Sequence, residues 1–459
     1  MSSSSRRSTS ATPSPSPHRA PLSRTFHVES LGCAKNQVDS ELLIAALEGE
    51  GWTLAGSPGE AHVLIVNTCG FIDPAKRESI ETSLELKALY PDKKVIMVGC
   101  LTERYGKELG SQLPEIDGFL GNKDPARIVD LVEGRISRGE RTRPERTRPG
   151  QTRLERTRLL SFPGSAYVKV AEGCSNRCTY CAIPLIRGDL ASRTIQSIID
   201  EIRKLLDRGV RELILIAQDL GSYGTDRGAA ELPRLLERMA ALSGLFWVRL
   251  LYIHPDKFPP AILDLMAADH RFLPYFDLPF QHASPKILAA MGRTPDAQAN
   301  LALLADIRAR LPQAVIRSTF LVGFPGETDD DFRQLLDFQG KARLEWLGAF
   351  TYSLEEGTPA HSMKGQVPAA IAAKRLHQIE SRQRTITEAA LDSQVGRTLD
   401  VLVEEEVQGE DMSIGRAYLH APEVDGLVVV RKSLSPGQWV RAKIVRRNGV
   451  DLEAEPVRE

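Results

Sequence analysis

The stretch Gly173-Cys174-Ser175-Asn176-Arg177-Cys178-Thr179-Tyr180-Cys181 places three thiols within eight residues, at the spacing C-x3-C-x2-C. A structural zinc site needs four ligands, whereas three sulfurs on one short loop match three irons of a 4Fe–4S cubane and leave the fourth iron open. Tyr180 lies between the last two cysteines, where its ring can pack against a planar ligand of that iron. The stretch therefore predicts an iron–sulfur loop beside a ligand pocket.

The other three cysteines, Cys33, Cys69 and Cys100, are scattered along the first hundred residues. Disulfides use cysteines in pairs, so two separate sites of three thiols fit this division better. Such sites need reduced thiols, which predicts a cytoplasmic protein. No apolar run approaches the length of a membrane span, about 18 residues, so a soluble protein is expected.

The length and charge of the chain limit its class. Its 459 residues predict two or three domains. The formal net charge of −1 excludes a protein that is basic overall, although local basic patches remain possible. Residues 1–24 are rich in Ser, Arg and Pro and are predicted to be a disordered tail, because their prolines would break the amphipathic helix of an organellar targeting signal.

Residues 25–135 alternate strand-like and helical runs three times, which predicts a small parallel α/β sheet. Cys33, Cys69 and Cys100 each follow one of the predicted strands. Because the carboxyl ends of parallel strands share one edge of a sheet, the fold is expected to bring these thiols together. The alternative is three unrelated buried cysteines.

Residues 136–160 contain a repeated Arg-Thr-Arg unit without apolar periodicity and are predicted to form a solvated linker. Residues 161–395 then alternate strand and helix six times, which predicts an incomplete (β/α)6 barrel followed by a long helix. Its expected strands are Ala166–Val170, Glu212–Ala217, Trp247–Tyr252, Phe276–Phe280, Val315–Val322 and Leu347–Tyr352.

Polar residues crowd the ends of these strands, where the active site of an α/β barrel lies. They include Gln218, Asp219, His254, His282 and the turn Gly323–Glu327. Either histidine, taken alone, is better explained as an ordinary residue at the end of a strand.

Residues 396–459 are rich in Val and Gly and predict a small antiparallel β domain. Its expected strands are Leu399–Glu405, Ile414–Leu419, Leu427–Val430 and Val440–Val445. From Arg397 onward the segment holds nine Lys and Arg residues against twelve Asp and Glu residues. A net acidic domain repels RNA and attracts a basic protein, so Glu404, Glu405 and Glu406 are expected to face such a partner. The alternative is a local RNA-facing patch made by Arg441, Lys443, Arg446 and Arg447.

Several motifs carry a resemblance to a known family. They are Ser30-Leu31-Gly32-Cys33-Ala34-Lys35-Asn36, Val66-Asn67-Thr68-Cys69-Gly70-Phe71-Ile72, Cys181-Ala182-Ile183-Pro184, Ala217-Gln218-Asp219, Arg249-Leu250-Leu251-Tyr252 and Ala421-Pro422-Glu423-Val424-Asp425-Gly426. With the order of the domains, they make the chain from about Phe26 to Val457 similar to the radical S-adenosylmethionine (SAM) methylthiotransferases. Within that family it resembles the branch that modifies ribosomal protein S-twelve. Ala34 and Gln37 depart from the Pro and Leu that are usual near the first cysteine.

The resemblance implies an N-terminal methylthiotransferase domain, a radical SAM barrel and a C-terminal TRAM domain. It implies two 4Fe–4S clusters, one held by Cys174, Cys178 and Cys181 and the other by Cys33, Cys69 and Cys100. SAM serves as both radical source and methyl donor, two molecules per product. Its pocket is expected to include Tyr180, Gln218, Asp219, Ser318, Gly323 and Glu327, and no residue is expected to act as a catalytic acid or base.

The implied reaction adds a methylthio group to the β-carbon of an aspartate in ribosomal protein S-twelve, free or in the small subunit, with an electron donor such as flavodoxin or ferredoxin. The nearest alternative is a tRNA adenosine methylthiotransferase, which shares the six cysteines, although tRNA is an unlikely partner for an acidic C-terminal domain. A more distant alternative is a non-catalytic iron–sulfur electron carrier with an RNA-binding tail. That alternative leaves the six strand–helix units without a purpose.

Overall fold

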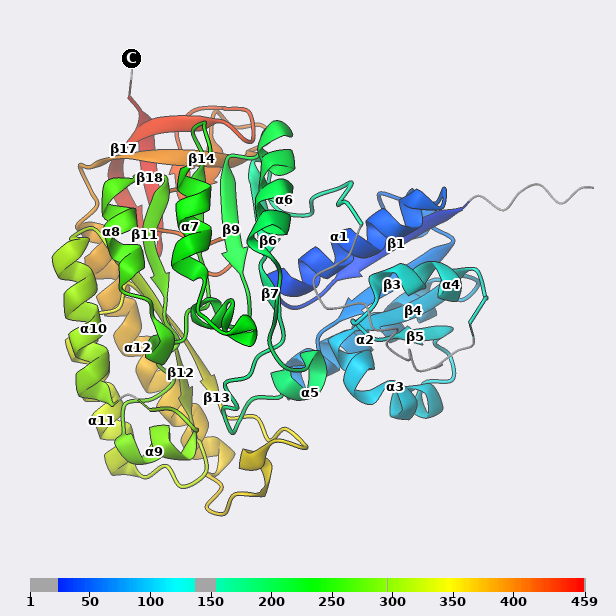
Figure 1. Cartoon of the computed structure of the whole chain (residues 1–459), viewed down its shortest axis with the longest axis horizontal. Helices are drawn as coiled ribbons and strands as arrows, with labels where there is room; N and C mark the ends of the chain where they lie inside the picture. The colour runs from blue at the N-terminus through cyan, green and yellow to red at the C-terminus, as the bar shows by residue number, and fades with distance from the viewer. Residues whose placement is uncertain (1–23, 137–153, 295, 458–459) are drawn as a thin grey trace, which may run out of the picture.

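The N-terminal domain is a parallel sheet with helices on both faces (Figure 1). The computed structural model describes residues 24–136, 154–294 and 296–457. The strand order is β2-β1-β3-β4-β5, and every pair is parallel. All six residues of the central strand β3 are buried, as near-continuous apolar runs predict for a sheet covered on both faces. The elements are β1 (Thr25–Ser30), α1 (Ala34–Gly49), β2 (Thr53–Leu54), β3 (Val63–Thr68), α2 (Asp73–Leu89), β4 (Lys94–Gly99), α3 (Cys100–Gln112), β5 (Gly118–Leu120) and α4 (Ile128–Val132).

The central domain is an open barrel whose six parallel strands stand in the order of the sequence, from β6 at one edge to β13 at the other. Each strand after the first is reached through helical segments on the outer side, and the largest apolar core lies between strands and helices. The strands are β6 (Ser165–Lys169), β9 (Glu212–Ile216), β10 (Trp247–Leu250), β11 (Phe272–Asp277), β12 (Val315–Val322) and β13 (Trp346–Thr351). The outer helices are α6 (Ile195–Asp207), α7 (Leu232–Ala240), α8 (Ala261–Ala268), α10 (Ala297–Arg310), α11 (Asp329–Ala342) and α12 (Ala369–Asp392).

The predicted limits of the fourth barrel strand were wrong. Strand β11 ends at Asp277, and Leu278 to Phe280 form a loop, after which Gln281 makes an isolated parallel bridge to Phe320 of β12. Phe280 is buried because its ring packs edge to face on Phe338 of α11, at 5.4 Å between ring centroids. The sequence pattern did not distinguish an aromatic residue buried by a helix from one buried in a strand.

The C-terminal domain is a closed barrel of five strands in the order β14-β15-β16-β18-β17. The prediction missed β18 and described the domain as purely antiparallel, whereas β18 pairs in parallel with β16 and closes the barrel. A tight turn at Asn448 and Gly449 leads directly from β17 into β18. The strands are β14 (Thr398–Glu406), β15 (Ser413–Arg416), β16 (Val428–Val430), β17 (Trp439–Asn448) and β18 (Asp451–Pro456). The predicted three-domain architecture is otherwise confirmed.

The C-terminal domain caps the end of the central barrel opposite to the short helices α5 (Ile183–Arg187) and α9 (Pro285–Ala290) (Figure 1). Glu212 of β9, which is fully buried, joins the two domains. Its carboxylate accepts hydrogen bonds from Arg249 of β10 at 2.7 Å and from Arg416 of β15 at 2.6 Å. Arg416 also donates to Glu404 at 2.6 Å. Glu404 is therefore a buried structural residue, and the expectation that it faces a protein partner was wrong.

The end of the Arg-Thr repeat is also not solvated as predicted. Arg156 is 6% exposed and donates to Glu41 of α1 and to Glu201 of α6, each at 2.5 Å. Leu154 packs against apolar residues of both the N-terminal core and the core beneath the barrel. Charge repetition indicated a tether, but the two carboxylates lie in different domains and only the tertiary structure brings them to one arginine. Residues 137–153 of the predicted linker and residues 1–23 of the predicted tail lie outside the described residues.

The buried network at Glu212 leads to a prediction for Arg416→Ala. Removing one partner of a buried ion pair leaves an uncompensated charge, so the free energy of unfolding should fall by about 3–5 kcal/mol in a urea titration. Arg441→Ala is the matched control, because Arg441 is largely exposed and lies 3.7 Å from Asp400. The control should change the free energy by about 1 kcal/mol or less. Equal effects of the two substitutions would contradict a stabilising role for the buried Glu212 network.

The same network predicts a pH dependence. Burial raises the pKa of the Glu212 carboxyl, but the guanidinium groups of Arg416 and Arg249 outweigh it and lower the pKa from 4.5 to about 2. A carboxyl with a lowered pKa stabilises the fold above the pKa of the unfolded chain and loses that contribution as the pH falls. The free energy of unfolding should therefore decrease between about pH 4.5 and pH 2, and less steeply in Glu212→Gln than in the parent.

Candidate functional site

The loop with the three clustered cysteines follows the first barrel strand and is fixed by neighbouring loops. The Cys174 amide donates to the Gly188 carbonyl at 3.1 Å, and the Thr179 amide donates to the Met291 carbonyl at 3.0 Å. Gly173 adopts φ +70°, and a Cβ there would lie 2.2 Å from the Asp189 carbonyl oxygen, so only glycine fits where the loop begins. The three thiols are therefore held on a rigid loop at the carboxyl end of the barrel.

The three scattered cysteines come together at the edge of the N-terminal sheet, as predicted from the strand pattern. Cys33 precedes α1, Cys69 follows β3 and Cys100 opens α3, so they follow the adjacent strands β1, β3 and β4. A Cβ on Gly32 would lie 3.2 Å from the Cys69 sulfur, which places the first two cysteines side by side. Cys100 lies in the first turn of α3, directly after β4.

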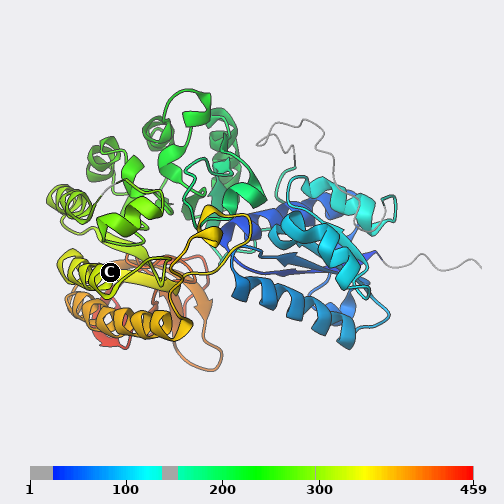
Figure 2. The same ribbon diagram turned by 90° about the horizontal axis from the view of Figure 1, so that it is seen from below.

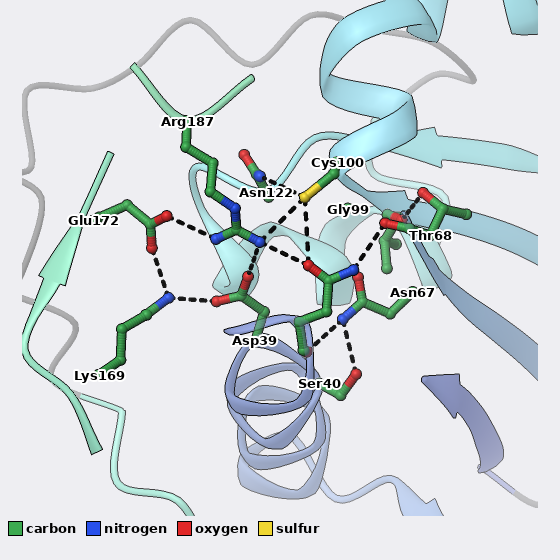
Figure 3. A network of polar contacts seen from close by, with 12 residues as sticks. Asp39, Ser40, Asn67, Thr68, Gly99, Cys100, Asn122, Lys169, Glu172 and Arg187 are labelled. Atoms are coloured by element: carbon green, nitrogen blue, oxygen red, sulfur yellow. Dashed lines mark hydrogen bonds and ion pairs between the residues drawn. The ribbon is translucent and has the colours of Figure 1, made fainter. Parts of the chain in front are cut away.

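Cys100 is the meeting point of the two domains (Figure 3). Its sulfur lies 3.1 Å from Nη2 of Arg187 on α5, 3.3 Å from Oδ1 of Asn36 and 3.6 Å from Nδ2 of Asn122. Arg187 stands six residues after Cys181, on the short helix that continues the iron–sulfur loop. One side chain of the barrel therefore connects the loop of the first cysteine triad to a thiol of the second.

Arg187 is stabilised by two carboxylates. Its guanidinium donates to Asp39 of α1 at 2.9 Å and to Glu172 at 2.7 Å. Lys169 pairs with the same two carboxylates, at 2.5 Å and 2.7 Å. The four charges form a closed square across the domain boundary, visible in Figure 3. Burial lowers the pKa of the Arg187 guanidinium, but Glu172 and Asp39 outweigh it and leave the pKa raised, so the residue is a permanent cation.

Cys100 is the buried thiol of its triad, whereas Cys33 is exposed, and nearby charges act on the ionisation of the thiols. Burial raises the pKa of Cys100 to about 12; Arg187 opposes this, and the charges of Cys33 and Cys69 add to it. Burial likewise raises the pKa of Cys181 to about 12, and the charges of Cys178 and Cys174 raise it further. The members of each triad thus lie within electrostatic reach of one another. Thiolates in such surroundings need a cation, which is the condition a metal cluster meets.

Each triad supplies three thiols, which suits three irons of a cubane better than the four ligands of a structural zinc ion. Among residues 24–136, 154–294 and 296–457, no group of three His, Cys, Asp or Glu side chains is arranged to hold one metal ion.

Several residues predicted to line a SAM pocket hold neighbouring loops in place. Asp219, which is 2% exposed, accepts hydrogen bonds from Asn176 of the cysteine loop at 2.9 Å and from the His254 amide at 3.0 Å. The Ser318 hydroxyl bridges the Leu278 carbonyl and the Phe280 amide, at 2.7 Å and 3.2 Å. These two side chains hold loops in place and have few atoms left for a ligand.

The turn after β12 is built in the same way. The Glu327 carboxylate accepts from the amides of Gly323 and Phe324 and pairs with Arg375 of α12 at 3.1 Å. Gly323 adopts φ +75°, and a Cβ there would lie 2.6 Å from that of Ala372. The turn is therefore fixed between barrel and helix.

Gln218 and Tyr180 are the remaining predicted pocket residues. Both polar atoms of the Gln218 amide are buried and have no hydrogen-bond partner in the described structure. Tyr180 packs against the small apolar cluster of Met291, Phe324 and Ala360, and its hydroxyl accepts from Arg293 at 3.0 Å. A buried amide without a partner is costly, which indicates that a ligand satisfies it.

The two strand-end histidines lie near the site without forming a catalytic pair. Burial lowers the pKa of His254 to about 4, with a further decrease from Arg293, so the ring is neutral near pH 7. His282 is fully buried, and its Nδ1 accepts from the Ser284 amide at 3.0 Å. This agrees with the expectation that each is an ordinary structural residue.

Sequence reasoning missed the charged residues that surround the cysteines. Arg187, Arg293, Lys169 and Asp39 come from four different segments and match no spacing motif. A signal was available for Arg187, because it ends the short run that follows Cys181, but the sequence does not show what lies opposite to it.

The chain was compared with known proteins. Residues 168–338 match the Radical SAM superfamily, residues 395–457 match the TRAM domain, and residues 25–121 match a family described as Uncharacterized protein family UPF0004. A relative from Treponema denticola is 45% identical over 93% of this chain and 99% of its own length, and its name is ribosomal protein uS12 methylthiotransferase RimO. The chain belongs to this methylthiotransferase family. Relatives with the same name from Heliobacterium modesticaldum and Aquifex aeolicus are 42% and 40% identical, over 95% and 93% of this chain and 96% and 95% of their own lengths.

A solved structure supports the fold of the family member. The radical SAM methyltransferase TsrM from Kitasatospora setae, determined with cobalamin and a 4Fe–4S cluster, aligns with a TM-score of 0.54 at 18% identity, over 74% of each chain. At this identity the likeness concerns the fold alone. Among the helices that the structure describes, none is long and apolar enough to cross a lipid bilayer. The domain limits given above stay predictions.

The Arg187 contacts predict that Arg187→Gln loosens the N-terminal domain. Asp39 and Glu172 would share only Lys169, so the free energy of unfolding should fall by about 3–5 kcal/mol in a urea titration. Arg177→Gln is the matched control from the same loop, since Arg177 pairs with Asp189 in an exposed position. Its effect should stay within about 1 kcal/mol. A change in Arg187→Gln as small as that of the control would show that the square of charges does not hold the domains.

Proposed function

We propose that this protein is a radical SAM methylthiotransferase that places a methylthio group on the β-carbon of an aspartate in ribosomal protein uS12, the S-twelve protein of the sequence analysis. The observation that carries the proposal is the pair of cysteine triads, on separate domains, joined through Arg187 and Cys100 at 3.1 Å. A single triad suffices for radical generation, so a second triad beside it points to a second chemical task. The shared names of the relatives agree with this reading.

The proposed cofactors are two 4Fe–4S clusters and SAM. Cys174, Cys178 and Cys181 hold the cluster of the barrel, and Cys33, Cys69 and Cys100 hold the cluster of the N-terminal domain. An sp3 carbon–hydrogen bond at a β-carbon is not acidic enough for a side-chain base of ordinary pKa. When bound, the cofactors supply one-electron chemistry together with the sulfur and the methyl group.

The protein contributes position and shielding. The backbone bonds that anchor the cysteine loop keep its sulfurs in a fixed geometry, as a site of this kind requires. The cation of Arg187 favours the thiolate of Cys100, the form that binds metal. The unpartnered amide of Gln218 and the ring of Tyr180 are proposed to contact SAM, while Asp219, Ser318, Gly323 and Glu327 hold the loops that shape its pocket.

The proposed partners are uS12, free or in the small ribosomal subunit, and a reductant such as flavodoxin or ferredoxin, in the cytoplasm. All six cysteines are free thiols, which suits a reducing compartment. Binding of tRNA is disfavoured by the pairing of the basic residues of the TRAM domain. Arg446 pairs with Glu453, and Arg447 pairs with Asp392 at 2.7 Å, so neither is a free phosphate ligand.

Two cysteine substitutions separate the proposed tasks. Cys178→Ala removes a ligand of the barrel cluster, so reductive cleavage of SAM to deoxyadenosine should vanish. Cys69→Ala removes a ligand of the other cluster, so SAM cleavage should survive while methylthiolation stops and the iron content falls by about half. The measurements are chromatography of deoxyadenosine, mass spectrometry of uS12 and iron analysis of full-length reconstituted protein.

Each outcome excludes an alternative. Undiminished SAM cleavage in Cys178→Ala would remove the cysteine loop from the radical chemistry. Loss of both activities in a folded Cys69→Ala variant would contradict the two-site arrangement. If the parent protein cleaves no SAM, the electron-carrier alternative gains support. Mass spectrometry of uS12 and of tRNA from a strain that lacks this protein identifies the substrate, and loss of the group from tRNA alone would favour the tRNA alternative.

A further inference from the structure

Lys35 is a buried cation without a carboxylate partner. It lies in the first turn of α1, two residues after Cys33, and is 8% exposed. Its ammonium donates a hydrogen bond of 3.3 Å to the Ala217 carbonyl, beyond the end of β9, and lies 3.6 Å from the centroid of the Tyr252 ring. In the described part of the chain no Asp or Glu oxygen lies within 4.0 Å of it. Buried lysines are nearly always paired with a carboxylate, whereas Lys35 has only a carbonyl and an aromatic ring as partners.

The same domain boundary shows that carboxylates are available for a lysine. Lys169 lies a short distance away along the boundary and pairs with both Asp39 and Glu172. Asp277 exerts an electrostatic effect on Lys35 but is itself paired with Arg317 at 3.6 Å. Burial lowers the pKa of the Lys35 ammonium, and the charge of Cys33 opposes this decrease. Lys169 therefore pairs with two carboxylates at this boundary, whereas Lys35 contacts only a carbonyl and an aromatic ring.

A second polar group lies next to this contact in the chain. Gln218 follows Ala217, whose carbonyl accepts from Lys35, and both polar atoms of the Gln218 amide are buried and unpartnered in the structure as described. An ammonium without a carboxylate and an amide without a hydrogen-bond partner are suited to a ligand with anionic oxygens. The two residues come from different domains and stand between Cys33 of one triad and the barrel end that carries the other.

We propose that Lys35, assisted by Gln218, recognises the carboxylate of the substrate aspartate, an inference that rests on the function proposed above. The carboxylate of an aspartate is bonded directly to its β-carbon, so fixing the carboxylate also fixes the reacting carbon next to Cys33. A charge-assisted hydrogen bond inside a shielded boundary discriminates against an asparagine, which offers no charge to the ammonium. Lys35 is thus a specificity-determining residue.

The test is a double-mutant cycle on binding. Full-length reconstituted protein is titrated with purified uS12 and with uS12 in which the aspartate that the parent enzyme modifies, located by mass spectrometry, is changed to Asn. Lys35→Met should weaken binding of the Asp form by about tenfold to hundredfold, the value of one hydrogen bond to a charged group. It should change binding of the Asn form by less than about twofold, because that form never engages the ammonium.

Lys169→Met is the matched control, a lysine of the same boundary whose partners are internal. It should affect both forms of uS12 equally. Lys35→Arg retains the cation and should retain the preference for the Asp form, which keeps the test valid if Lys35→Met fails to fold. Equal weakening of both forms by Lys35→Met, or loss of the preference in Lys35→Arg, overturns the proposal. Failure of the proposed function differs, because mass spectrometry then finds no methylthiolated aspartate in uS12 treated with the parent protein.

Discussion

The contact between Arg187 and Cys100 is the interaction on which the arrangement of the two cysteine sites depends. The arginine belongs to the helix that continues the barrel's cysteine loop. Its Nη2 lies 3.1 Å from the sulfur of Cys100 in the N-terminal domain (Figure 3). A buried guanidinium is tolerated only with partners of opposite charge, so Asp39 and Glu172 are as necessary as the arginine itself. Because these partners lie on both sides of the boundary, the charges pair only when the domains are docked in this orientation.

The two parallel sheets bring three thiols together in different ways. In the barrel one loop supplies all three thiols, and in the N-terminal domain three adjacent strands supply one each. Figure 2 shows that the N-terminal domain lies beside the barrel and does not cover its end. Helix α1 crosses that boundary, with Cys33 and Lys35 at its start and Asp39 one turn later. One helix thus carries a proposed cluster ligand, the unpaired cation and a partner of Arg187.

The other end of the barrel is fixed by a second buried network. Glu212 pairs with Arg249 and Arg416 there, and the C-terminal barrel packs against aromatic residues that point inward from the strands, such as Trp247 and Trp346. Ion pairs and apolar contacts at this end carry stability, while the carboxyl ends of the strands carry chemistry, as in other α/β barrels. One end of the barrel is therefore rigidly packed, while at the other end the Gln218 amide has no hydrogen-bond partner in the described structure.

The sequence by itself determined the three domains, the six cysteines as two triads and nearly all of the barrel strands. These features depend on local spacing and on hydrophobic periodicity, which one segment expresses without reference to any other. Only the tertiary structure decided that Arg156 is buried between Glu41 and Glu201, that Asp219 and Glu327 hold loops in place, and that β18 closes the last barrel. It also decided that, in the described part of the chain, no carboxylate pairs with Lys35. The physical reason is that burial and ion pairing depend on groups that are distant in the chain. A local sequence pattern does not show which charged side chains will pair.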